Sequence, residues 1–235
     1  MGSSGRNKGL IASLLLLILT AACRESAVPP AADSLPYAAE LRKFREADSL
    51  SPPPPGMILF TGSSSFRRWD SLEQDFAPYP VLNRSFGGST FDDLLQIAHQ
   101  AVWPYRPSAV FVYQGDNDLT RPGVTPELVM GRARRFADSV RIRLPGVPVI
   151  FLAPKLSPSR RHRQADYERL RDSLRTWAVS GPAAGWADTY SPLLDAQGRC
   201  VPAYFAEDSL HLSRAGYLKW REVLRPMVQQ YATHR

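Results

Sequence analysis

The sequence predicts a doubly wound α/β domain built around a parallel sheet. Short apolar runs recur between residues 57 and 187, and continuous runs of this kind are typical of strands buried on both faces. Stretches with apolar residues at helical spacing separate the runs, as expected of strand-helix-strand units. Glycine-rich and polar clusters follow several runs, which suits the carboxyl ends of parallel strands, where such sheets bind their ligands.

Five runs are the candidate strands, in chain order residues 57–60, 81–82, 109–113, 147–152 and 186–187. The second and fifth runs are shorter and give weaker signals than the other three. None of the three stronger runs alternates apolar with polar residues, so neither face of the sheet is expected to meet water.

Helical patterns fill the spaces between the strands. Thr125 is a suitable N-cap, and Pro126 and Glu127 suit the first turn that follows it. Ser213 is the expected cap of the last helix. Two apolar stripes at helical spacing are formed by Tyr167, Leu170, Leu174 and Trp177, and by Tyr217, Trp220, Leu224 and Tyr231. We interpret these stripes as core rather than as cofactor contacts.

Residues 1–22 have the features of a secretory signal. Arg6 and Lys8 precede an apolar stretch of eleven residues, 10–20, and two small residues follow it. A permanent membrane helix needs about 20 residues, so this stretch is too short to span a bilayer. Residues 23–55 are expected to be a linker that contains a short helix over about 36–50 and ends in a polyproline spacer. The domain proper is then expected over residues 56–235.

Cys23 comes directly after the small residues. Thr20-Ala21-Ala22-Cys23 resembles a bacterial lipobox, in which the cysteine is acylated and becomes the mature N-terminus. This resemblance implies a lipoprotein anchored to a membrane of the bacterial cell envelope, in the periplasm or at the surface. The alternative is an ordinary cleaved signal with a chance cysteine, which would make a Cys23–Cys200 disulfide conceivable in an oxidising compartment.

The composition excludes several classes of protein. The chain is 44% hydrophobic and has two cysteines, which argues against a disordered chain and a disulfide-stapled miniprotein. Four of the 29 basic residues are lysines and the others are arginines, and many lie close to acids, as between Asp166 and Arg175. The net charge of +7 is therefore attributed to solvated helix faces, and no nucleic-acid partner is expected.

Four polar clusters could carry chemistry, namely residues 62–65, 86–90, 115–118 and 208–212. Each alone has a structural explanation, because hydroxyls cap helices, glycine pairs form tight turns and Asp or Asn initiates turns. His211 is a candidate base, since a carboxylate three residues earlier could fix the orientation of its ring.

Taken together and in this order, the clusters resemble the SGNH, or GDSL-type, serine hydrolases and acyl-esterases over about residues 57–231. The matching motifs are Gly62-Ser63-Ser64, the glycine pair that ends at Gly88, Gly115-Asp116-Asn117-Asp118, and Asp208 to His211. The resemblance implies a flavodoxin-like three-layer α/β/α sandwich with a five-stranded parallel sheet. It also implies an enzyme that needs no metal and no organic cofactor.

The resemblance assigns roles by position. Ser64 is the implied nucleophile, His211 its general base and Asp208 the residue that orients His211. The implied oxyanion hole consists of the N–H of Ser64, the N–H of Gly88 and the side chain of Asn117. The first motif departs from the family pattern, because Ser63 and Ser65 replace the Asp and Leu of Gly-Asp-Ser-Leu.

Three adjacent serines compete for the role of nucleophile. Aligning Gly62 with the family glycine selects Ser64, and we expect the hydroxyls of Ser63 and Ser65 to cap the helix that follows. The chain is thus expected to be an exported serine esterase acting on O-acetyl or other short-chain esters, on a glycan or a small molecule. A lysophospholipase or thioesterase is the alternative among enzymes. Outside enzymes, the alternative is a non-catalytic surface binding protein of the same fold.

Overall fold

Five parallel strands form one sheet in the order β2-β1-β3-β4-β5 in the computed structural model, which describes residues 1–2, 36–181 and 184–233. The strands are β1 (Ile58–Gly62), β2 (Val81–Ser85), β3 (Ala109–Tyr113), β4 (Val149–Leu152) and β5 (Gly185–Ala187). Every residue of β1, β3 and β4 is buried, as their continuous apolar sequences require. The expected five-stranded parallel sheet is confirmed.

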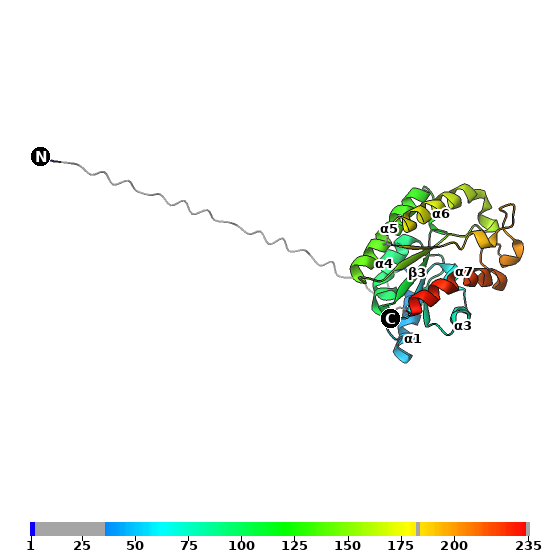
Figure 1. Cartoon of the computed structure of the whole chain (residues 1–235), viewed down its shortest axis with the longest axis horizontal. Coiled ribbons are helices and arrows are strands. Elements are labelled where there is room, and N and C mark those ends of the chain that lie inside the picture. Colours follow the sequence, from blue (N-terminus) through cyan, green and yellow to red (C-terminus); the bar gives the residue numbers. More distant parts are fainter. Residues whose placement is uncertain (3–35, 182–183, 234–235) are drawn as a thin grey trace. The chain divides into compact units, whose positions relative to one another are not determined.

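Helices cover both faces of this sheet (Figure 1). One layer contains α4 (Phe91–Ala101), α5 (Pro126–Arg143) and α6 (Gln164–Val179), and the other contains α2 (Ser64–Arg67), α3 (Leu72–Phe76) and α7 (Arg214–Thr233). Short 3₁₀ turns are η2 (Trp103–Tyr105), η3 (Asp118–Thr120), η4 (Pro158–Arg163), η5 (Ser191–Leu193) and η6 (Pro202–Tyr204). The expected three-layer α/β/α sandwich is therefore also confirmed.

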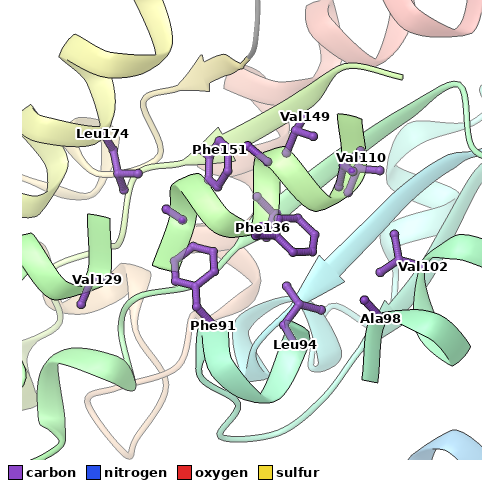
Figure 2. Packing of buried hydrophobic residues seen from close by; sticks show 14 of the residues in the cluster. Phe91, Leu94, Ala98, Val102, Val110, Val129, Phe136, Val149, Phe151 and Leu174 are labelled. Atoms are coloured by element: carbon purple, nitrogen blue, oxygen red, sulfur yellow. The ribbon is translucent and has the colours of Figure 1, made fainter. Parts of the chain in front are cut away.

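Two hydrophobic cores hold the layers together. Figure 2 shows part of the first core, where Phe91 of α4, Phe136 of α5 and Phe151 of β4 point toward one another. The second core, between the sheet and α7, contains the fully buried Phe66 and Trp220. Burial of each large apolar side chain stabilises the fold by about 1.5–3 kcal/mol.

Helix α1 (Ala38–Leu50), expected over about 36–50, packs onto the domain. Leu41 is 1% exposed and belongs to the same core as α4. Near the other end of α1, the Asp48 carboxylate pairs with Arg84 of the edge strand β2 and accepts a 2.7 Å hydrogen bond from the Tyr105 hydroxyl. The segment expected to be a linker thus contributes side chains to the packing of the domain.

Residues 3–35, which contain the expected signal and Cys23, lie outside the described residues. In the part of the chain that the structure does describe, no helix combines the length and the apolar character needed to cross a bilayer.

The strand register aligns the carboxyl ends of the central strands, because Gly62 pairs with both Ser85 and Tyr113. The chain runs from β1 outward to β2 and then crosses back to β3 on the other side of β1. The order of the strands therefore reverses between β1 and β3. In doubly wound sheets the ligand crevice lies beyond the carboxyl ends at this reversal.

Candidate active site

Ser64 stands at a sharp turn from β1 into α2. Gly62 has φ +126°, and a Cβ atom there would lie 2.1 Å from the carbonyl oxygen of Tyr113. Only glycine permits this close approach, which lets the chain leave the sheet at once. Ser64 is therefore the first residue of α2 and is half-buried beyond the carboxyl end of β1.

His211 connects Ser64 to Asp208. Its Nε2 atom lies 2.9 Å from Ser64 Oγ, and its Nδ1 atom lies 2.6 Å from Asp208 Oδ2. The other carboxylate oxygen of Asp208 accepts the backbone N–H groups of Leu210 and His211 at 3.0 and 2.9 Å. The structure thus brings the three predicted triad residues into one hydrogen-bonded chain.

Electrostatics favours a neutral His211 and an ionised Asp208. Burial lowers the pKa of His211 below its ordinary value of 6.5; the bond to Asp208 opposes this shift, and the charge of Arg68 reinforces it. The hydrogen bonds from His211 hold the pKa of Asp208 far below its usual range. Since ionised Asp208 can only accept, Nδ1 carries the proton and Nε2 is free to accept one from Ser64.

The three predicted oxyanion donors belong to segments that contact one another. Asn117 Nδ2 donates to Ser63 Oγ at 2.6 Å and to the carbonyl oxygen of Ser89 at 3.0 Å. The backbone N–H groups of Ser64 and Gly88 make no hydrogen bond to any described residue. Ser89 is fully buried, and its hydroxyl donates to the Gly62 carbonyl at 3.2 Å. This bond fixes the glycine loop against the end of β1.

The hydroxyls of Ser63 and Ser65 do not cap α2, so that expectation is wrong. The Ser63 side chain forms no capping bond, and its oxygen accepts from Asn117 instead. Helix α2 has only four residues, and the backbone carbonyl of Ser63 already accepts from the N–H groups of Phe66 and Arg67. Ser65 is buried, and its hydroxyl oxygen has no hydrogen-bond partner within the described residues.

A buried ion pair beneath the turn of Asn117 was not predicted. Asp116 accepts from Lys155 Nζ at 2.8 Å, from the Tyr113 hydroxyl at 2.9 Å and from the Tyr167 hydroxyl. Lys155 is 1% exposed. Burial, the largest single influence, would raise the pKa of Asp116, but the charge of Lys155 and the hydrogen bonds from Lys155, Tyr167 and Tyr113 together outweigh it and lower that pKa. The sequence signal that could have revealed this pair is the single lysine, Lys155, in the apolar segment after the fourth strand.

Asp118, the last residue of the same motif, is a structural residue. Its fully buried carboxylate accepts the N–H of Phe91 at 3.1 Å and pairs with Arg132 at 2.9 Å. It thereby anchors the start of α4, where a negative charge also complements the helix dipole.

The remaining candidate residues concern metal binding and the two cysteines. In the part of the chain that the structure covers, no three His, Cys, Asp or Glu side chains gather as they would around a metal ion. Cys200 is half-buried, and its Sγ lies 3.5 Å from the Leu156 carbonyl oxygen. Cys23, the expected lipid attachment residue, is outside the described range.

Comparisons with known proteins give a family match and a fold match. The model of the GDSL-like Lipase/Acylhydrolase family matches residues 49–219. No curated protein matches the chain in sequence. Among solved structures, a GDSL-like lipase from Bacteroides thetaiotaomicron has a TM-score of 0.70 at 16% identity, over 82% of this chain and 98% of that one.

Two further structures extend the fold match. A lipase/acylhydrolase from Enterococcus faecalis has a TM-score of 0.60 at 17% identity, over 77% of this chain and 98% of that one. An acetylxylan esterase from Geobacillus stearothermophilus has a TM-score of 0.54 at 16% identity, over 78% of this chain and 99% of that one. At these identities the likeness is one of fold.

Proposed function

Because the chain belongs to the GDSL-like lipase/acylhydrolase family, we propose that it hydrolyses acyl esters through a triad of Ser64, His211 and Asp208. The observation that carries this proposal is the hydrogen-bonded chain from Ser64 Oγ through the His211 ring to Asp208. A neutral imidazole that accepts from a serine hydroxyl and donates to a carboxylate is the arrangement that activates a serine nucleophile.

In the first half of the reaction, Ser64 Oγ attacks the ester carbonyl and its proton passes to His211 Nε2. Asp208 keeps the ring oriented and stabilises the imidazolium that forms. The N–H groups of Ser64 and Gly88 donate to the oxyanion of the tetrahedral intermediate, and Asn117 joins them by giving up its bond to Ser63. When the intermediate collapses, the carbon–oxygen bond to the alcohol breaks and His211 protonates the departing oxygen.

The second half repeats the same steps with water. His211 takes a proton from water, the hydroxide oxygen adds to the acyl carbon, and the bond to Ser64 Oγ breaks as His211 returns the proton to the serine. The products are one carboxylic acid and one alcohol. The free enzyme is regenerated with His211 neutral.

The substrate we propose is an O-acetyl or other short-chain ester, carried by a glycan outside the cytoplasm. The acetylxylan esterase of the same fold supports an acetylated glycan. The signal-like residues 1–22 and the lipobox-like sequence ending at Cys23 support export and anchoring in the bacterial envelope.

An active-site probe tests the proposal. We expect a sulfonyl fluoride or fluorophosphonate to inhibit hydrolysis of a chromogenic acetyl ester and to label Ser64 alone in peptide maps. Ser64→Ala should leave at most the residual oxyanion-hole catalysis of disabled triads, roughly 10³–10⁴ over water. Ser63→Ala and Ser65→Ala are the matched controls and should retain substantial activity. A label on either control serine, or an active enzyme with no label, would overturn the assignment.

A further inference from the structure

Arg68 lies beside the triad with most of its hydrogen-bonding capacity unused. Its Nη1 atom is 3.3 Å from Asp208 Oδ2, and half of its side chain is exposed. A guanidinium carries five N–H donors, and no other bond of this one to a described residue is found. The remaining donors therefore have no partner among the described residues, on a side chain that is half exposed.

A second basic segment, in the loop after β4, is joined to the loop that carries two of the triad residues. The N–H of Ser159 donates to the Ser209 carbonyl at 3.0 Å, which joins η4 to the loop that holds Asp208 and His211. Arg160, the next residue, has a buried Nε atom with no hydrogen-bond partner in the described residues. Within those residues, neither Arg160 nor Arg161 pairs with an acid, whereas Arg163 pairs with Asp166 at 2.8 Å.

The acids nearby leave part of this positive charge uncompensated. Asp208 offsets the charge of Arg68, because its other partner, His211, is neutral. Asp116 is neutralised by the buried Lys155, and the charges of Arg160 and Arg161 remain. Glu207, which is exposed, is the remaining acid on the triad loop. Arg67 differs from Arg68, since it lines a cavity of about 260 Å³ together with Asp70 and Glu73.

We propose that the alcohol part of the substrate carries an anionic oxyacid group, a carboxylate or a phosphate, which binds to Arg68 and Arg160. This inference rests on the proposed function, which determines whether the acyl part or the alcohol part of the ester lies near Arg68. His211 must protonate the departing alcohol oxygen, so that part of the substrate lies beside the His211 ring, and Arg68 is held near the same ring by its contact with Asp208. The planar fork of an arginine can bind either oxyacid group in a bidentate manner. Under the proposed function, the carboxylate case corresponds to an acylated acidic glycan.

Matched esters test this inference. Three probes share one acyl group and one ring: meta-acetoxybenzoate, meta-acetoxyphenyl phosphate and the neutral methyl meta-acetoxybenzoate. For each ester, kcat/KM is divided by the rate of its hydroxide-catalysed hydrolysis. We expect the ratio of this normalised value for an anionic ester to that for the neutral ester to exceed unity. Arg68→Gln should lower this normalised ratio about tenfold, equivalent to about 1.4 kcal/mol. Arg160→Gln should lower it in the same direction, and added salt should weaken it.

Arg143→Gln is the control, because it removes the same charge from the end of α5, which leads into the amino end of β4, whereas the triad lies beyond the carboxyl ends of the strands. The probe with the higher ratio identifies the oxyacid. A wild-type ratio of unity, or a ratio unchanged by Arg68→Gln, would overturn the inference while leaving esterase activity intact. Failure to hydrolyse any of the three esters would instead overturn the proposed function and this inference with it.

Discussion

Both amide hydrogens of Asn117 are occupied before any substrate arrives. They bind Ser63 Oγ and the Ser89 carbonyl, so the side chain is already oriented toward the turn that carries Ser64. In the proposed mechanism, the oxyanion that forms on the substrate competes for Asn117 with the neutral hydroxyl of Ser63, where the family pattern has an Asp. A carbonyl that gains negative charge in the transition state wins that competition better than a ground-state ester does.

Asn117→Ala should lower kcat by about 10²–10³ with little change in KM, because the donor acts mainly in the transition state. The loss of two hydrogen bonds should also reduce the free energy of unfolding by about 1–2 kcal/mol. Steady-state kinetics and thermal unfolding measure the two effects separately. An effect on KM alone, or loss of the folded state, would identify Asn117 as a purely structural residue.

In the proposed mechanism, the protonation of His211 sets the pH dependence. The base must be neutral to accept the proton of Ser64, and burial lowers the pKa of its ring below 6.5. As the pH falls through that lowered pKa, His211 becomes charged and kcat/KM is lost. We therefore expect the acid limb of the pH profile of kcat/KM to have its midpoint below 6.5.

Arg68→Gln removes a positive charge near the ring, so it should move the midpoint of this acid limb to higher pH. Circular dichroism at each pH distinguishes titration of His211 from acid unfolding. A wild-type midpoint at or above pH 6.5 would contradict this prediction. It would show either that another group limits the rate or that the reaction does not need a neutral His211.

At the scale of elements, a partly buried ion pair helps to fix helix α1 to the domain. Arg84 is 8% exposed, and Asp48 of α1 is its carboxylate partner. Asp48→Ala should lower the free energy of unfolding by roughly 2–4 kcal/mol, since it leaves the cation unpaired. Denaturant unfolding measures the change.

Glu46→Ala is the matched control on the same helix. Glu46 pairs with Arg42 across 4.0 Å, and both side chains are more than half exposed. Exposed pairs of this kind contribute about 0–1 kcal/mol, so the control should change the free energy of unfolding little. Equal effects of the two substitutions would show that α1 is not held by the Asp48–Arg84 pair.

The elements could be predicted where one local pattern determines them. The runs that became β1, β3 and β4 have no alternation, and their burial on both faces follows directly. The position of α1 could be predicted, but its packing could not, because Asp48 finds its partner 36 residues away, beyond the polyproline spacer. Lys155 likewise meets a carboxylate 39 residues away, which no local pattern reveals.

In the candidate site, too, local features could be predicted from the sequence and contacts between distant residues could not. The choice of Ser64 depended on aligning Gly62 with the family glycine, and the close approach of Gly62 to Tyr113 explains why a glycine is needed there. The capping expectation for Ser63 used local propensity alone. It failed because the actual partner, Asn117, comes from the end of another strand.

At the scale of the whole molecule, the proposed nucleophile and base come from opposite ends of the domain sequence. Ser64 and His211 are 147 residues apart in sequence and meet because the parallel strands present their carboxyl ends at one edge. Under the proposed mechanism, ester hydrolysis therefore requires nearly the whole chain from β1 to α7 to be folded.

The proposed anchor gives a prediction at the same scale. Acyl chains on Cys23 would hold the protein at a membrane, because stable attachment needs more than one chain. Cys23→Ala should move the protein from the membrane fraction to the soluble fraction, or block its processing, without changing the activity of the folded domain. Mass spectrometry of the mature N-terminus provides the direct measurement. A wild-type protein without lipid there would refute the anchor.

The burial of Lys155 makes it a natural footprinting reporter. Amine-reactive reagents modify lysines in proportion to their contact with water, and Lys43 is exposed while Lys155 is 1% exposed. In the folded protein, acylation of Lys43 should run to completion while Lys155 stays unmodified. The rate at which Lys155 is modified then measures how often the segment that carries Asn117 opens. This rate can be followed by peptide mass spectrometry without any substrate.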